Sequence, residues 1–138
     1  MKVKYDMDAL HRMSLFEKVT KSRLKDYFEH NDKILFVVEN GFLRKALGEN
    51  KKNVTRLEEL LKRRIKIIEY NDSMERFIAN VMAPLKIVEM KIDGDVVTIV
   101  GPDQKTKGLM IGSKAANLRM YEGIVQKYFP QLKEIKVV

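Results

Sequence analysis

The sequence predicts an α+β protein built from two tandem copies of one unit, each a three-stranded sheet with helices on one face. Two observations predict the duplication. A glycine turn occurs within residues 46–54 and again within residues 110–118, sixty-four positions later. In both copies the order is an apolar residue, Gly, four variable residues, Asn and a branched apolar residue. Tight-hairpin signals recur at Asn31-Asp32 and Asp93-Gly94, sixty-two positions apart. We therefore expect two domains, residues 1–70 and 71–138.

The first expected domain contains six elements in the order α-β-β-α-α-β. In chain order they are a helix at 8–21, strands at 24–30 and 33–39, helices at 41–48 and 51–64, and a strand at 65–70. The apolar stripe of the first helix is Leu10, Met13, Phe16 and Val19, with Asp6 or Asp8 near its start. The stripe of the long helix is Val54, Leu57, Leu60 and Leu61. Apolar β-branched and aromatic residues fill the three strands.

The second expected domain repeats this order. Its elements are a helix at 74–82, strands at 85–92 and 95–100, a short helix or turn at 105–112, a helix at 113–129 and a strand at 134–138. Residues 71–73 supply capping side chains for the first helix, and Pro84 ends it. The stripe of the longer helix is Leu118, Tyr121, Ile124, Val125 and Tyr128, and Pro130 ends that helix.

Positive charge is concentrated around the first glycine turn. The net charge is +8 at pH 7, and residues 44–66 hold nine Lys or Arg against three Asp or Glu. A basic balance of this kind favours binding to polyanions, of which nucleic acid is the commonest. A solvated, lysine-rich surface is the alternative interpretation of charge alone.

Each glycine turn precedes a long helix, whose first backbone N–H groups form a ready anion site. A lone glycine turn more often just permits a sharp bend, but here donor side chains surround both copies. The candidate phosphate-binding residues of the first copy are Arg44, Lys45, Gly48, Asn50, Lys51, Lys52 and Arg56. Those of the second copy are Gly112, Ser113, Lys114, Ala115 and Arg119.

These turns resemble the G-x-x-G loop of the KH domain, an RNA-binding module, and the element order resembles its type II topology. The chain resembles the archaeal NusA-like family of transcription termination/antitermination factors, in which two such domains follow a helix like the one that reads "ALHRMSLFEKVT" here. The most specific part of the resemblance lies in the segments "ALGENKKNVTRLEELL" and "KGLMIGSKAANLRM". It implies a non-catalytic factor that clamps single-stranded RNA and acts with RNA polymerase. It places a base groove at Ala46, Leu47 and Val54 in the first copy and at Met110, Ile111 and Leu118 in the second. For Leu47 and Ile111, an ordinary core position is an equally good interpretation.

Both loops depart from the family pattern because the second glycine is missing. Lys51 and Ala115 occupy that fourth position. If the position needs a left-handed backbone, a Cβ there costs about 1–2 kcal/mol. If it is already the first helical residue, the replacement costs little. Glu49 in the first loop also repels phosphate, although the neighbouring cations should outweigh it.

Other motifs give no sign of enzyme chemistry, a metal site or a cofactor. His11 and His30 lack ligand spacing, and the absence of cysteine excludes disulfides and thiolate metal sites. The cluster Lys62-Arg63-Arg64 follows a helix C-terminus, where cations also favour the helix dipole, so we rank it below the loop lysines as an RNA contact. No apolar run approaches the ~18 residues of a membrane span, so we expect a cytoplasmic protein without a membrane partner. We also expect a monomer.

Two other functions stay open. Loss of the second glycine in both loops could leave a KH-fold adaptor that docks on polymerase or the ribosome with weak or no RNA binding. Two helices joined by a glycine turn also describe a helix-turn-helix that binds duplex DNA. The hairpin before each helix pair and the closing strand argue against that assignment.

Overall fold

The computed structural model describes residues 6–138. Residues 1–5, which begin the first expected domain, lie outside the described residues. The chain divides into two compact units, one ending at Asn71 and the other spanning Asp72–Val138. Each unit is described by itself.

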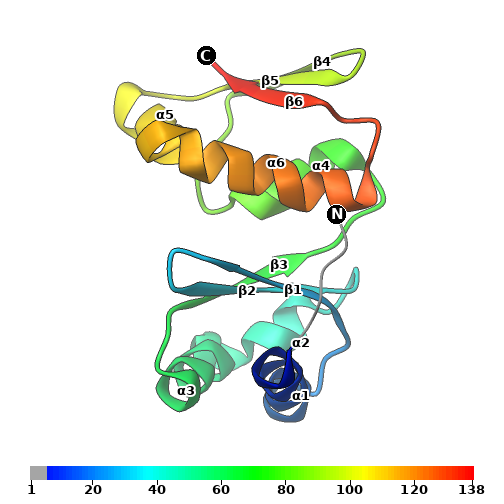
Figure 1. Ribbon diagram of the computed structural model, residues 1–138, viewed down its shortest axis with the longest axis vertical. Coiled ribbons are helices and arrows are strands. Elements are labelled where there is room, and N and C mark those ends of the chain that lie inside the picture. The colour runs from blue at the N-terminus through cyan, green and yellow to red at the C-terminus, as the bar shows by residue number, and fades with distance from the viewer. Residues whose placement is uncertain (1–5) are drawn as a thin grey trace. The chain divides into compact units, whose positions relative to one another are not determined.

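The first unit is a mixed three-stranded sheet with its helices on one face (Figure 1). Its elements are α1 (Met7–Thr20), β1 (Leu24–His30), β2 (Lys33–Val38), α2 (Leu43–Leu47), a 3-10 turn η1 (Glu49–Lys51), α3 (Lys52–Leu61) and β3 (Ile65–Glu69). The strand order is β1-β2-β3; β1 and β2 are antiparallel, and β2 and β3 are parallel. Asp6 caps α1, where its carboxylate accepts the Ala9 N–H at 2.7 Å.

The core of the first unit lies between the helices and the sheet. Phe16 of α1 stacks on Phe36 of β2 with ring centroids 4.3 Å apart, and Tyr27 meets Phe36 edge-on at 5.7 Å. Leu57 brings α3 into the same cluster, and Ala46 does so for α2. The loop between α2 and α3 is therefore held at both sides by buried residues.

The second unit has the same architecture (Figure 1). Its elements are α4 (Met74–Met82), β4 (Glu89–Asp93), β5 (Val96–Val100), α5 (Gln104–Ile111), a 3-10 turn η2 (Ser113–Ala115), α6 (Ala116–Tyr128) and β6 (Glu134–Val137). β4 and β5 are antiparallel, and β5 and β6 are parallel. Ser73 caps α4 by accepting the Arg76 N–H at 3.4 Å. The buried faces of α4 and α6, including Phe77 and Val125, supply much of its core.

The α+β class and the repeated α-β-β-α-α-β order are confirmed, with the topology expected of type II KH domains. Among residues 6–138, no helix combines the length and apolar character that crossing a bilayer requires.

Three local predictions are wrong. Leu10 and Leu60 are each 48% exposed, because the core-facing lines of α1 and α3 run through Phe16 and Leu57 and leave these leucines at the edge. The strand predicted from residue 85 begins at Glu89, after a turn in which the Leu85 N–H bonds to the Met82 carbonyl at 3.1 Å. In the second hairpin Asp93 pairs with Val96, so the turn residues are Gly94 and Asp95. Gly94 takes φ +64° at the first central position, where type II′ turns favour glycine.

Candidate nucleic-acid interface

The glycine of each loop cannot be replaced by a residue with a side chain without strain. Gly48 has φ +74° and Gly112 has φ +73°, a backbone region that favours glycine. A Cβ on Gly48 would lie 2.9 Å from Asn53 Nδ2, and one on Gly112 would lie 2.7 Å from Asn117 Cγ. Both glycines thus permit the sharp bend and the close approach of the following helix.

The fourth position of each loop has a left-handed backbone, which settles the question that the missing glycines raised. Asn50 and Lys51 have φ +53° and +58°, and Lys114 and Ala115 have φ +52° and +61°. Lys51 and Ala115 precede the first helical residues of α3 and α6. The alternative that the fourth position is already helical is therefore wrong. Each non-glycine residue there costs about 1–2 kcal/mol.

These conformations leave backbone N–H groups open at the start of each long helix. The Lys51 N–H bonds to the Gly48 carbonyl at 3.1 Å, and the Ala115 N–H bonds to the Gly112 carbonyl at 3.2 Å. Within residues 6–138, no protein group accepts a hydrogen bond from the N–H of Glu49 or Asn50, or of Ser113 or Lys114. No side chain caps α3 or α6 either. The two open N–H groups of each loop and the positive end of the helix dipole together suit a phosphate oxygen.

An asparagine holds each loop in place. Asn53 Nδ2 donates to the Ala46 carbonyl at 3.1 Å and to the Lys45 carbonyl at 3.3 Å, and so ties α3 to the end of α2. Asn117 Nδ2 donates to the Leu109 carbonyl at 2.9 Å in the second unit. The prediction of site residues missed this positioning role, although the asparagine recurs in the turn pattern itself and could have indicated it.

Carboxylates fix the first helix of each pair. Glu69 of β3 accepts the N–H groups of Gly41 and Leu43 at 3.0 and 3.2 Å, at the start of α2. Asp103 accepts the Thr106 N–H at 2.7 Å at the start of α5, and this hydrogen bonding lowers the pKa of Asp103 below its ordinary value. Neither anchor was predicted. Glu69 is distant in sequence from the helix that it caps, whereas Asp103 directly precedes its helix, and that position could have indicated the cap.

The first loop adjoins a surface hollow of about 560 Å³ along α3. Its lining brings together three predicted residues, Asn50, Lys52 and Arg56. The other predicted cations, Arg44, Lys45 and Lys51, are exposed on α2 and on the loop. Glu49 is exposed in the loop, and Glu59 lines the hollow as well. The first loop therefore has an excess of cations with two carboxylates among them.

The second loop presents fewer free cations than predicted. Ser113 and Lys114 are exposed, but Arg119 Nη1 bonds to both oxygens of Glu122 at 2.9 and 2.8 Å. Glu122 also accepts the Ile135 N–H at 2.8 Å. Arg119 keeps other guanidinium donors for a ligand, but its charge is already paired. Lys114 is thus the principal cation of the second loop.

Burial divides the six predicted groove residues. Ala46 and Met110 are fully buried and Leu118 is 6% exposed, so these three belong to the core and cannot present a face to a base. Leu47, Val54 and Ile111 are half-buried and reach the surface. Leu47 and Ile111 are therefore only partly enclosed by the core, and base contact stays a prediction for them.

Comparison with known proteins gives a consistent set of relatives, although no family profile matches the chain. A probable transcription termination protein NusA from Methanococcus vannielii is 30% identical over 141 residues, covering 100% of this chain and 81% of that protein. The protein of the same name from Methanocaldococcus jannaschii is 26% identical, covering 99% of this chain and 76% of its own length. The one from Halococcus morrhuae is 28% identical over 94% of each chain.

A solved structure shares the fold. The crystal structure of a protein designated APE1850 superposes with a TM-score of 0.72, covering 96% of this chain and 99% of that one. The sequence identity is 22%, so this similarity concerns the fold.

Proposed function

The chain belongs to the archaeal NusA family, and we propose that it acts in transcription termination or antitermination as a non-catalytic factor that holds single-stranded RNA. The observation that carries the RNA-binding proposal is the loop geometry. In each unit a glycine bend and two left-handed residues leave two backbone N–H groups open at a helix N-terminus, beside exposed lysine.

In the proposed mechanism each loop holds RNA through its backbone. Phosphate oxygens accept hydrogen bonds from the open N–H groups, and Lys51, Lys52 and Lys114 neutralise their charge. A KH loop of this kind clamps about four nucleotides. Gly48 and Gly112 contribute by letting the helix start approach closely, and Asn50 and Ser113 add side-chain donors.

Bases would lie against the half-buried Leu47 and Val54 in the first unit and against Ile111 in the second. Aliphatic contacts carry little hydrogen-bond information about base identity, so the proposal predicts modest sequence preference and strong dependence on salt. Each neutralised phosphate of a single strand contributes about −0.7 to the slope of log K against log salt. RNA polymerase is the proposed protein partner, on the basis of the relatives' name and the family resemblance, and the proposed state is a monomer.

Fluorescence anisotropy with a labelled single-stranded RNA tests the function. Two charge-reversed proteins, Lys51→Glu with Lys52→Glu and Lys114→Glu alone, should each weaken binding and reduce the salt slope. The double variant Lys86→Glu with Lys91→Glu makes the same change in net charge as the first-loop variant at exposed positions in and before β4. It controls for non-specific attraction. Unchanged affinity in both loop variants removes the loops from the mechanism.

A protein-interaction adaptor is the second candidate, and three observations favour it. Arg119 is paired with Glu122, Glu49 stands in the first loop, and neither loop has its second glycine. This candidate predicts no RNA binding by the wild-type protein even at low salt, together with retention by purified RNA polymerase or ribosomes.

A further inference from the structure

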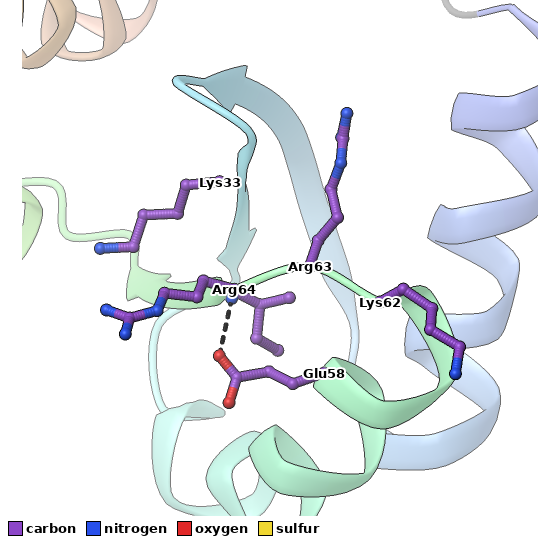
Figure 2. A pocket seen from close by; sticks show the side chains of 6 residues that line it. Lys33, Glu58, Lys62, Arg63 and Arg64 are labelled. Carbon is purple, nitrogen blue, oxygen red and sulfur yellow. Dashed lines mark hydrogen bonds between the residues drawn. The ribbon is translucent and has the colours of Figure 1, made fainter.

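A second group of cations lies at the opposite end of α3 from the first loop. It lines a surface hollow of about 620 Å³ (Figure 2). The lining residues are Lys33, Glu58, Lys62, Arg63, Arg64 and Ile65. All of them lie in the first unit, and none has an aromatic side chain for a base to stack on. The hollow therefore suits a charged group better than a base.

Strand pairing brings two of these cations together from distant parts of the sequence. Ile34 pairs with Ile65 in the parallel register of β2 and β3, and the Ile34 N–H bonds to the Arg64 carbonyl at 2.9 Å. Lys33 and Arg64 each directly precede these paired residues. In Figure 2 their side chains extend to the same side of the hollow.

The remaining cations of the hollow are differently placed. Lys62 and Arg63 point away from the side that Lys33 and Arg64 share (Figure 2). Arg63 is paired with Glu29. The carboxylate of Glu58 is also engaged within the protein, because its Oε2 accepts the Ile65 N–H at 3.1 Å. Lys33 and Arg64 are thus the cations of this hollow that are best placed to share one ligand.

The potential near this pair is positive. Lys66 of β3 follows Arg64 by two positions. Burial and, secondarily, the charge of Lys33 lower the pKa of Lys66 from 10.5 to about 8. The charge of Lys33 thus disfavours the protonated form of Lys66, and an anion bound beside Lys33 would offset this repulsion.

We propose that Lys33 and Arg64 bind a backbone phosphate of the same RNA strand that the first loop holds. This inference rests on the RNA-binding function proposed above. The ten residues of α3 separate the two sites by about 15 Å, which a stacked strand covers in roughly four nucleotides. Arg64 offers a planar fork of donors to phosphate oxygens, and Lys33 adds a point charge.

Anisotropy titrations with two RNA lengths test the assignment. One labelled RNA has about four nucleotides, enough for a loop alone, and the other has about twelve, enough to reach the hollow. Arg64→Glu should weaken binding of the longer RNA about five- to tenfold, reduce its salt slope by about 0.7 and leave the shorter RNA unaffected. The matched control is Lys62→Glu, with the same charge reversal two positions earlier on a side chain that points away.

Each outcome decides between explanations. Equal losses in Arg64→Glu and Lys62→Glu would show general attraction and overturn the site. If Arg64→Glu leaves the affinity for the longer RNA unchanged while the double variant Lys51→Glu with Lys52→Glu lowers it, the site in the hollow is overturned and the loop mechanism stands. Absence of RNA binding by the wild type would instead reject the proposed function. Loss of polyglutamate binding in Arg64→Glu, with RNA binding intact, would assign the hollow to an acidic polypeptide.

Discussion

Replacing Ala115, the residue before α6, by glycine should stabilise the protein, although glycine inside a helix destabilises it. Ala115 has φ +61° and ψ +22°, where a Cβ costs about 1–2 kcal/mol. Glycine removes that strain, but it also gives the unfolded chain greater conformational freedom, which lowers the free energy of unfolding by about 0.4–1 kcal/mol. The expected net gain is about 0.5–1 kcal/mol in the free energy of unfolding.

The neighbouring residue provides a matched control. Ala116 is the first residue of α6 and has φ −61°, so Ala116→Gly should destabilise by about 0.5–1 kcal/mol. The first loop offers the same pair of substitutions, Lys51→Gly at φ +58° and Lys52→Gly at φ −59°, with equal loss of charge. Identical substitutions one residue apart should therefore change stability in opposite directions in both units.

Urea denaturation followed by far-UV circular dichroism measures these differences. For a unit of this size, 1 kcal/mol corresponds to about 4–8 °C in Tm, so thermal scans give an independent reading. RNA affinity should persist in Ala115→Gly because the loop conformation is the same. If Ala115→Gly and Ala116→Gly destabilise equally, the fourth loop position is helical and the loop geometry argued above is wrong.

Two further predictions concern stability alone. Gly112→Ala should destabilise the protein by about 2 kcal/mol or more, since its Cβ would meet Asn117 at 2.7 Å and φ is positive. Gly108→Ala lies inside α5 with open space around it, and should stabilise the protein by about 0.5–1 kcal/mol. If urea denaturation gives equal effects for the two variants, the close approach at Gly112 is contradicted. For Lys66, whose pKa is lowered to about 8, the unfolded chain binds more protons between about pH 8 and 10.5, so wild-type stability should rise with pH across that window. Lys66→Met should be more stable than the wild type by roughly 2 kcal/mol near pH 7, and a difference that does not shrink toward pH 10.5 would refute the burial of that charge.

Periodicity and turn chemistry were sufficient to predict the repeated fold. Helix stripes such as the one through Phe77 and the hairpin turn at Asn31 depend on contacts close in sequence, which the pattern encodes directly. The positions of Leu10 and Leu60 were predicted wrongly because helical spacing defines a stripe but not how wide the buried face is. That width depends on the neighbouring elements.

The candidate site could be predicted less completely. Gly48 and Gly112 stand out from sequence because the turn repeats, but the left-handed backbone at Ala115 is a strain that only the surrounding structure imposes. The pairing of Arg119 with Glu122 was accessible from their spacing of three residues on a helix. The approach of Lys33 to Arg64 was not, since it depends on the parallel register of β2 and β3.

The most direct test of the central proposal is an NMR titration of the isotopically labelled protein with a short single-stranded RNA. Backbone N–H groups that hydrogen-bond to phosphate change their chemical shifts strongly on binding. The largest changes should fall on Glu49 and Asn50 in the first loop and on Ser113 and Lys114 in the second. Saturable binding whose shift changes avoid both loops would contradict the proposed clamp.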